Sequence, residues 1–126
     1  MQIAQSLRVN ATLKSLDLSD NEIGELGATQ LAESLRVNAT LTNLVLRGNP
    51  TCDTGAIQLA ECLRVNTTLL SLRLCHNRIG NLGATHLAEC LGANTTLTSL
   101  DLRVNNFGTA AHALRTACPP QCTLFV

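Results

Sequence analysis

The sequence predicts an α/β solenoid shaped as a horseshoe, with a parallel β-sheet on the concave face and α-helices on the convex face. Three observations support this prediction. The chain repeats itself at a fixed interval along its whole length. Within each interval, one short segment alternates polar and apolar residues, which is typical of a half-buried strand. A second segment places apolar residues three and four positions apart, which is typical of an amphipathic helix.

The 28-residue period is visible in four columns, of which three hold leucine and one holds asparagine. The columns are Leu13, Leu41, Leu69 and Leu97; Leu16, Leu44, Leu72 and Leu100; Leu18, Leu46, Leu74 and Leu102; and Asn21, Asn49, Asn77 and Asn105. Chance does not align four such columns, so the chain is an array of about 4.5 repeats.

Each repeat begins with the strand and continues with the helix. In residues 15–18, Leu16 and Leu18 alternate with polar residues, so the leucines are expected in the core and their neighbours on the open face of the sheet. Residues 28, 31, 32 and 35 form the apolar stripe of the helix, which returns in the next two repeats. Strands stack about 4.8 Å apart and helices about 8–10 Å apart, so the stack must curve with the sheet inside.

The pattern LxxLxLxxNxI, which runs here from Leu13 to Ile23, resembles the leucine-rich repeat family. The 28-residue period and the motif GAxxLAxxL at residues 83–91 resemble its ribonuclease-inhibitor-like subclass. The stretch LAESLRVNATLTNL is similar to repeats of NOD-like receptors, which are intracellular immune sensors. The resemblance implies a protein-binding role and a cytoplasmic location.

The repeats predict a single domain over residues 1–126. It consists of a partial repeat at 1–12, repeats at 13–40, 41–68, 69–96 and 97–123, and an irregular C-terminal cap at 108–126. Residues 3–7 match residues 31–35, so we expect the chain to open inside a helix. Two cut ends suggest a piece of a longer array, whose uncapped ends could self-associate.

The C-terminal repeat departs from the period. With a slip of one residue, Leu114 takes the place of Leu87, and Thr123-Leu124 aligns with Thr96-Leu97. This alignment predicts that the chain stops where a new strand should begin.

Composition argues against several classes of function. Nine basic residues balance nine acidic ones, which gives no reason to expect nucleic-acid binding. No apolar run approaches the length of about 20 residues that spans a bilayer, and no signal peptide is present, so we expect no membrane association. The glycines form no phosphate-binding loop, and we expect no cofactor and no metal.

Cys75-His76 is the one pair that suggests catalysis, of the kind found in a cysteine hydrolase. Adjacent strand residues point to opposite faces, which is poor geometry for a nucleophile and its base. The chain is therefore expected not to be an enzyme.

Two sets of asparagines allow more than one interpretation. We expect the column that begins at Asn21 to hydrogen-bond the backbone of neighbouring turns rather than a ligand. Asn10, Asn38, Asn66 and Asn94 each begin an N-glycosylation pattern. Either these sites carry sugars in a secreted protein, or each asparagine ends a helix in the left-handed conformation and the repeat creates the pattern by itself. The second interpretation is favoured.

Six cysteines could form three disulfides. Cys62 and Cys90 occupy one helix position in adjacent repeats, and a helix spacing of about 8–10 Å exceeds the roughly 7 Å limit for a bridge. Cys118 and Cys122 are close in sequence and could pair or bind metal. Reduced thiols are the favoured state.

The strand residues that face away from the core change from repeat to repeat, whereas the helix exterior hardly changes: GATQLAES returns as GAIQLAEC and GATHLAEC. This contrast predicts a partner-binding strip on the concave face. Its residues are Asp17, Ser19, Asp20, Val45, Arg47, Arg73, Cys75, His76, Asp101, Arg103 and Val104. Chance divergence after a recent duplication is the alternative.

The predicted function is a protein–protein recognition module, a fragment of an intracellular sensor or regulator of the NOD-like receptor type, which binds a protein partner on its concave face. Two alternatives remain open. Proteins that activate the nuclear-transport GTPase share this architecture, although no residue motif carries over from them. A purely structural repeat scaffold is the other alternative.

Overall fold

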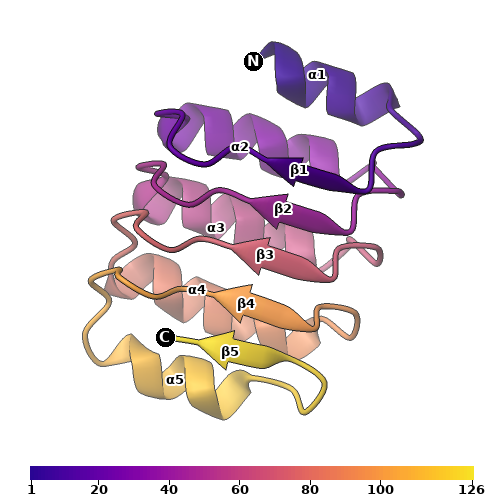
Figure 1. Ribbon diagram of the computed structural model, residues 1–126. Coiled ribbons are helices and arrows are strands. Elements are labelled where there is room, and N and C mark those ends of the chain that lie inside the picture. Colours follow the sequence, from indigo (N-terminus) through magenta and orange to yellow (C-terminus); the bar gives the residue numbers. More distant parts are fainter.

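The structure is a computed structural model that describes residues 1–126, and it is a stack in which helices and strands alternate along the chain (Figure 1). In chain order the elements are α1 (Gln2–Val9), β1 (Ser15–Asp17), α2 (Gly24–Leu35), β2 (Asn43–Val45), α3 (Cys52–Leu63), β3 (Ser71–Arg73), α4 (Asn81–Ala93), β4 (Ser99–Asp101), α5 (Ala110–Ala117) and β5 (Thr123–Phe125).

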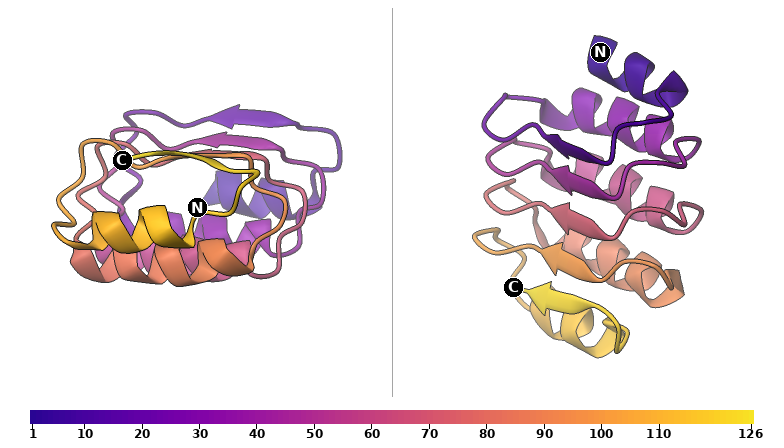
Figure 2. Two further views of the ribbon diagram at one scale, coloured as in Figure 1. Left: turned by 90° about the horizontal axis from the view of Figure 1, so that it is seen from below. Right: turned by 45° about the vertical axis from the view of Figure 1, so that its right-hand side comes forward.

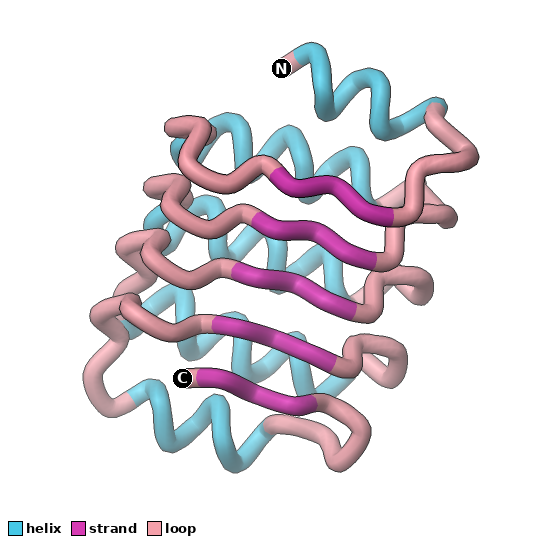
Figure 3. The backbone as a smooth tube through the Cα atoms, in the orientation of Figure 1, coloured by secondary structure: helices cyan, strands magenta, loops and turns pink.

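All five strands form one parallel sheet in the order β1-β2-β3-β4-β5. The helices form a second layer against one face of the sheet, and the other face stays open (Figures 2 and 3). The predicted α/β solenoid is therefore confirmed. None of the helices combines the length and the hydropathy that a bilayer-crossing helix requires.

The leucine columns set the register of the sheet. Leu16 pairs with Leu44, Leu44 with Leu72, and Leu72 with Leu100. Leu44, Leu72 and Leu100 are almost fully buried between sheet and helices, whereas Leu16, on the first strand, is half-buried. A slip of one residue would turn every strand leucine toward solvent, so burial of this face fixes the register.

Glycine lets neighbouring helices approach closely. A Cβ atom at Gly55 in α3 would lie 2.7 Å from the Cβ of Ala28 in α2 and 2.8 Å from the Cβ of Thr51. Real side chains do not pack at such distances, so a larger residue would push α2 and α3 apart.

The asparagine column that follows the strands forms the expected ladder. Asn49 is fully buried, and its Nδ2 donates to the carbonyls of Leu18 (2.9 Å) and Leu46 (3.1 Å). Its Oδ1 accepts from the backbone N–H groups of Asn21 (3.1 Å) and Ile23 (3.0 Å). One amide side chain thus satisfies backbone groups of two successive loops, which confirms the structural interpretation of this column.

A second asparagine ladder follows the helices, and it corrects the sequence interpretation. Asn10 and Asn94 have extended backbones (φ −69° and −90°), and Asn38 and Asn66 also lack a positive φ. The expected left-handed helix ends are therefore wrong. Each Oδ1 instead accepts from the backbone N–H groups two and three residues ahead, which forms an Asx-type turn.

The same ladder bears on glycosylation. Asn38, Asn66 and Asn94 are each 5% exposed, and their Nδ2 atoms donate to the carbonyls of Leu7, Leu35 and Leu63 in the preceding repeat. A sugar would have to be attached to these same nitrogen atoms. Of the four asparagines that begin an N-glycosylation pattern, only Asn10 is exposed in the folded chain.

The loops after the strands share a left-handed backbone that the sequence did not reveal. Asp20 (φ 56°), Gly48 (70°), His76 (56°) and Val104 (57°) occupy equivalent positions in successive repeats. Glycine adopts this conformation freely, whereas a β-branched valine is strained there. Val104 is also 64% exposed, so packing does not compensate for the strain.

We expect Val104→Asn to stabilise the fold by about 1 kcal/mol, because asparagine tolerates the left-handed region better than valine. Chemical denaturation measures the change. Val65→Asn is the matched control, since Val65 is exposed and has no positive φ. An equal gain from both substitutions would show that the removal of a surface valine, and not relief of strain, is the cause.

The predicted alignment of Thr123-Leu124 with Thr96-Leu97 is wrong. Ser99 pairs with Thr123 and Leu100 with Leu124, so the partners on β4 and β5 are closer along the chain than those of the earlier strands, and residues 123–125 form a complete fifth strand. The physical reason is a shorter helix: α5 has 8 residues where α2 and α3 have 12. A turn at Pro119, closed by a hydrogen bond from the Cys122 N–H (3.0 Å), then returns the chain to the sheet.

Candidate functional site

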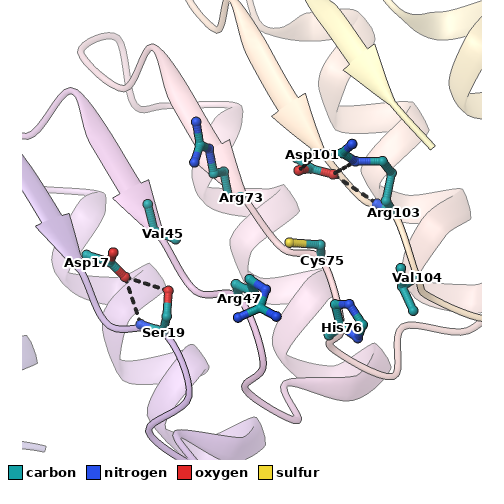
Figure 4. A pocket seen from close by; sticks show the side chains of 10 residues that line it. All are labelled: Asp17, Ser19, Val45, Arg47, Arg73, Cys75, His76, Asp101, Arg103 and Val104. Atoms are coloured by element: carbon teal, nitrogen blue, oxygen red, sulfur yellow. Dashed lines mark hydrogen bonds and ion pairs between the residues drawn. The ribbon is translucent and has the colours of Figure 1, made fainter.

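The open face of the sheet holds a depression of about 500 Å³. Its lining comes from the strands and from the loops that follow them: Asp17, Ser19, Val45, Arg47, Arg73, Cys75, His76, Asp101, Arg103 and Val104 (Figure 4). All ten belong to the predicted strip, so the structure brings these residues together. The eleventh, Asp20, is not part of the lining but contacts it through Arg47.

The parallel register arranges the lining in rows across the sheet. Val45, Arg73 and Asp101 are direct neighbours on β2, β3 and β4. Arg47, Cys75 and Arg103 each lie two positions after one of these residues in the sequence. Because side chains two residues apart share one face of a strand, both rows project from the side opposite to the buried leucines.

Arg103 and Asp101 form a two-pronged ion pair within the depression. The Nε of Arg103 donates to Oδ1 of Asp101 (3.0 Å), and Nη2 donates to Oδ2 (2.8 Å). The hydrogen bond from the Arg103 side chain, followed by that from its backbone N–H, outweighs burial and lowers the pKa of Asp101. The same pair raises the pKa of Arg103. Both groups are therefore charged at neutral pH.

Phe125 supports Arg103 from the neighbouring strand, a contact that the repeat pattern does not predict. Its ring lies 5.2 Å from the Arg103 guanidinium carbon, within the range of a cation–π interaction. In the observed register Phe125 pairs with Asp101. The signal was present in the sequence, but the wrong alignment of the last strand hid it.

Two aspartates near the first strand are also engaged. Asp17 accepts hydrogen bonds from the side chain and from the backbone N–H of Ser19 (2.9 Å for the latter), and these bonds lower its pKa. Asp20 pairs with Arg47 at 3.1 Å, and both side chains are more than half exposed. An exposed pair of this kind contributes little to stability, so Arg47 can exchange Asp20 for another carboxylate at low cost.

Arg73 is the one arginine of the depression that has no carboxylate partner. The ion pairs of the chain involve Arg47, Arg64 and Arg103, and Arg73 is exposed on the central strand β3. Its guanidinium extends from the sheet between Val45 and Asp101 (Figure 4). The charge of Arg73 acts on Asp17 and Asp101 at longer range, but its guanidinium keeps a full set of hydrogen-bond donors for any ligand that enters.

Cys75 and His76 both line the depression, which corrects the expectation that they point to opposite faces. Cys75 still lies on the face that the alternation along β3 gives it, whereas His76 lies in the left-handed turn after the strand (φ 56°), where the alternation no longer applies. Burial, followed by the charge of Asp101, raises the pKa of the Cys75 thiol. The thiol is thus held in its protonated, weakly nucleophilic form.

We expect Asp101→Asn to lower stability at neutral pH by up to about 1 kcal/mol, because it breaks the pair with Arg103. Since the folded pKa of Asp101 is lowered, this contribution is present above the unfolded pKa near 4 and is lost as the pH falls through the folded pKa. Denaturation at pH 7 and at pH 3 measures the difference between the two proteins. A difference that stays constant across this range would contradict the assignment.

No group of three or more histidine, cysteine or acidic side chains is arranged to hold a metal ion. The charged groups of the depression are arginines and aspartates whose hydrogen-bonding atoms face solvent or one another. Such a surface can bind the polar and charged side chains of a protein.

Comparisons with known proteins agree with the fold. No curated protein sequence is similar enough to this chain to count as a relative. Among solved structures, the actin-binding site 2 (ABS2) of leiomodin-1 superimposes with a TM-score of 0.82 at 20% sequence identity, and the match covers 92% of this chain and 70% of that chain. At this identity the likeness shows the fold alone.

The family comparison matches the repeats themselves. A family model described as "Leucine Rich repeat" matches residues 9–32, 65–88 and 93–110, which together make up just over half of the chain. The matched segments include the strands β1, β3 and β4 and the loops that follow them. The chain belongs to the leucine-rich repeat family.

Proposed function

We propose that this chain is a protein-recognition module that binds its partner on the concave face of the sheet. The observation that carries the proposal is the contrast between the two faces. Ten side chains that differ from repeat to repeat line one depression, while the segments GATQLAES, GAIQLAEC and GATHLAEC of α2, α3 and α4 keep almost the same residues. A scaffold that is held constant while one surface varies is what a recognition protein requires.

The backbone of the depression supports this proposal. Val104 retains a β-branched side chain at a left-handed position, although Gly48 shows that glycine fits the same place. Local strain that persists at a surface is a feature of functional sites. The strain thus supports the proposal that the variable residues of the depression bind a partner.

Within this general role, we propose that the chain is part of the recognition region of a cytoplasmic NOD-like receptor or a similar regulator, with repeats of the ribonuclease-inhibitor-like subclass. The support is the resemblance of its 28-residue repeats to those of such receptors. The two alternatives are a GTPase-activating protein and a structural scaffold. The name of the leiomodin-1 structure records actin binding by that protein, so actin is included as one candidate partner in the test.

The test compares Arg73→Glu with Arg36→Glu, the same charge change on an exposed arginine at the end of α2. Partners isolated from a cell extract with the unchanged chain are purified and titrated against all three proteins. Actin and a nuclear-transport GTPase are titrated in parallel.

We expect Arg73→Glu to weaken binding at least about tenfold, as for a central arginine of an interface, and Arg36→Glu to leave it unchanged. Equal binding by all three proteins would place the interface elsewhere. Faster release of phosphate from GTP would support the GTPase-activating alternative, and the absence of any partner would support the scaffold.

A further inference from the structure

Two cysteines lie at the ends of the turn that joins α5 to β5. Cys118 follows the last residue of α5, and Cys122 directly precedes β5. The Sγ of Cys118 lies 3.2 Å from the backbone carbonyl oxygen of Cys122, so the Cys118 side chain reaches across the turn to Cys122. All six cysteines of the structure are free thiols, and these two are the only ones that share a turn.

The turn between the two cysteines is rigid before any bond forms. Pro119 and Pro120 each have a ring that fixes φ, and the Cys122 N–H donates to the Pro119 carbonyl (3.0 Å). Folding has therefore already brought the two ends of this segment together, and disulfide formation in the folded chain requires little further loss of conformational entropy. Proximity of this kind raises the effective concentration of one thiol at the other.

We propose that Cys118 and Cys122 form an intramolecular disulfide when the chain meets glutathione disulfide, and that this pair is a reversible modification site that fastens β5 to α5. The site is separate from the concave depression, and the proposal does not depend on what the depression binds.

The exposures of the two thiols assign their roles. Cys118 is half-buried and accessible to a dissolved disulfide, whereas Cys122 is 8% exposed. Burial, followed by the neighbouring Cys118, raises the pKa of Cys122 to about 12. Cys118 is therefore the attacking thiol and Cys122 the resolving one.

The reaction proceeds by two exchanges. The Cys118 thiolate attacks one sulfur of glutathione disulfide, and a bond forms between Cys118 and one glutathione while the other leaves as a thiolate. Cys122 then loses its proton and attacks the Cys118 sulfur, which expels the second glutathione as a thiolate. The two protons lost by the cysteines end on the two glutathiones. The protein is oxidised by two electrons, and one glutathione disulfide is reduced to two thiols.

The other four cysteines lack the means for this reaction. Cys62 and Cys90 are buried on adjacent helices, and burial raises the pKa of Cys62 to about 12. Neighbouring helices keep such positions about 8–10 Å apart, beyond the roughly 7 Å limit for a disulfide. Cys52 begins α3 and Cys75 lies in the loop after β3, and the pKa of each is also raised by burial.

The bond would act on the last strand of the sheet. β5 is held to β4 by hydrogen bonds that include Thr123 N–H to Thr98 O (2.8 Å) and Leu102 N–H to Phe125 O (2.7 Å). Phe125 in turn lies against Arg103, a residue of the depression. Oxidation that fixes the start of β5 would thus raise the melting temperature and hold the support of Arg103 in place.

The experiment equilibrates the whole folded chain with an excess of glutathione disulfide, followed by acid quenching, denaturation and alkylation. We expect a mass loss of about 2 Da before alkylation, and two fewer alkylated cysteines after it than the six of the untreated chain. Trypsin cleaves after Arg115 and leaves both cysteines in the peptide 116–126, so the link is mapped within a single peptide.

Two variants separate the roles. Cys122→Ser is expected to stop at the mixed disulfide and to gain the mass of one glutathione at Cys118, and Cys118→Ser to remain unmodified. Cys52→Ser, a half-buried cysteine elsewhere, is the control and should oxidise like the unchanged chain. The proposal is overturned if the unchanged chain keeps all six thiols, if its disulfide maps to another pair, or if glutathione stays attached to Cys118. The unchanged chain decides all three outcomes without any variant.

Discussion

Replacing Asn66 with alanine is expected to destabilise the fold by about 3 kcal/mol or more, since several buried backbone groups would lose their partners at once. The Oδ1 of Asn66 accepts from the N–H groups of Thr68 (3.0 Å) and Leu69 (2.8 Å). Its Nδ2 donates to the carbonyl of Leu35 (2.7 Å) in the preceding repeat. Asn66 is 5% exposed, so bulk solvent does not reach these backbone groups in the folded chain.

Asn10→Ala is the matched control for this experiment. Asn10 begins the same local motif, and its Oδ1 accepts from the N–H groups of Thr12 (3.0 Å) and Leu13 (2.7 Å), but its side chain is exposed. We expect a loss of about 1 kcal/mol, as for a helix cap. The difference between the two variants, measured by chemical denaturation, reports the contact between repeats. Equal losses would mean that the ladder does not hold the repeats together.

Leu72→Ala is expected to cost about 3–4 kcal/mol, within the range for a buried leucine that leaves a cavity. Leu72 is 1% exposed on the central strand β3, and its register neighbours Leu44 and Leu100 lie on either side. The helices pack against the inner face of the sheet around Leu72, so the cavity left by the alanine cannot collapse fully. Thermal or chemical denaturation gives the magnitude.

Leu70→Ala serves as the control for Leu72→Ala, because Leu70 is only two residues away but 42% exposed. We expect a loss below about 1 kcal/mol, since little apolar area is buried there. If Leu70→Ala costs as much as Leu72→Ala, the assignment of Leu72 to the core is wrong.

The register of the sheet could be predicted from the sequence because every repeat must bury a leucine at the same position of its strand. Leu16, Leu44, Leu72 and Leu100 must all face the helices, and a parallel sheet in which each strand pairs with its counterpart in the next repeat is the arrangement that buries them. The same alternation accounts for eight of the ten residues that line the depression, whereas His76 and Val104 lie in left-handed turns after the strands, where alternation does not apply.

The remaining features depend on local geometry that the period does not encode. The early return of the last strand follows from a shortened helix, and nothing in the repeat specifies which residues a helix omits. The left-handed turns hold Asp20, Gly48, His76 and Val104, and because valine avoids this conformation the column does not predict it uniformly. The ion pair of Arg103 and Asp101 depends on side-chain rotamers that only the packed sheet selects.

Hydroxyl-radical footprinting of the chain in complex with its partner is the most direct test of the claim that the variable concave face binds. His76 and His112 are both exposed and oxidise readily, but His76 lines the depression and His112 lies on the helix α5. We predict that partner binding protects His76 several-fold and leaves the oxidation of His112 unchanged. Protection of His112 with no change at His76 would contradict the account.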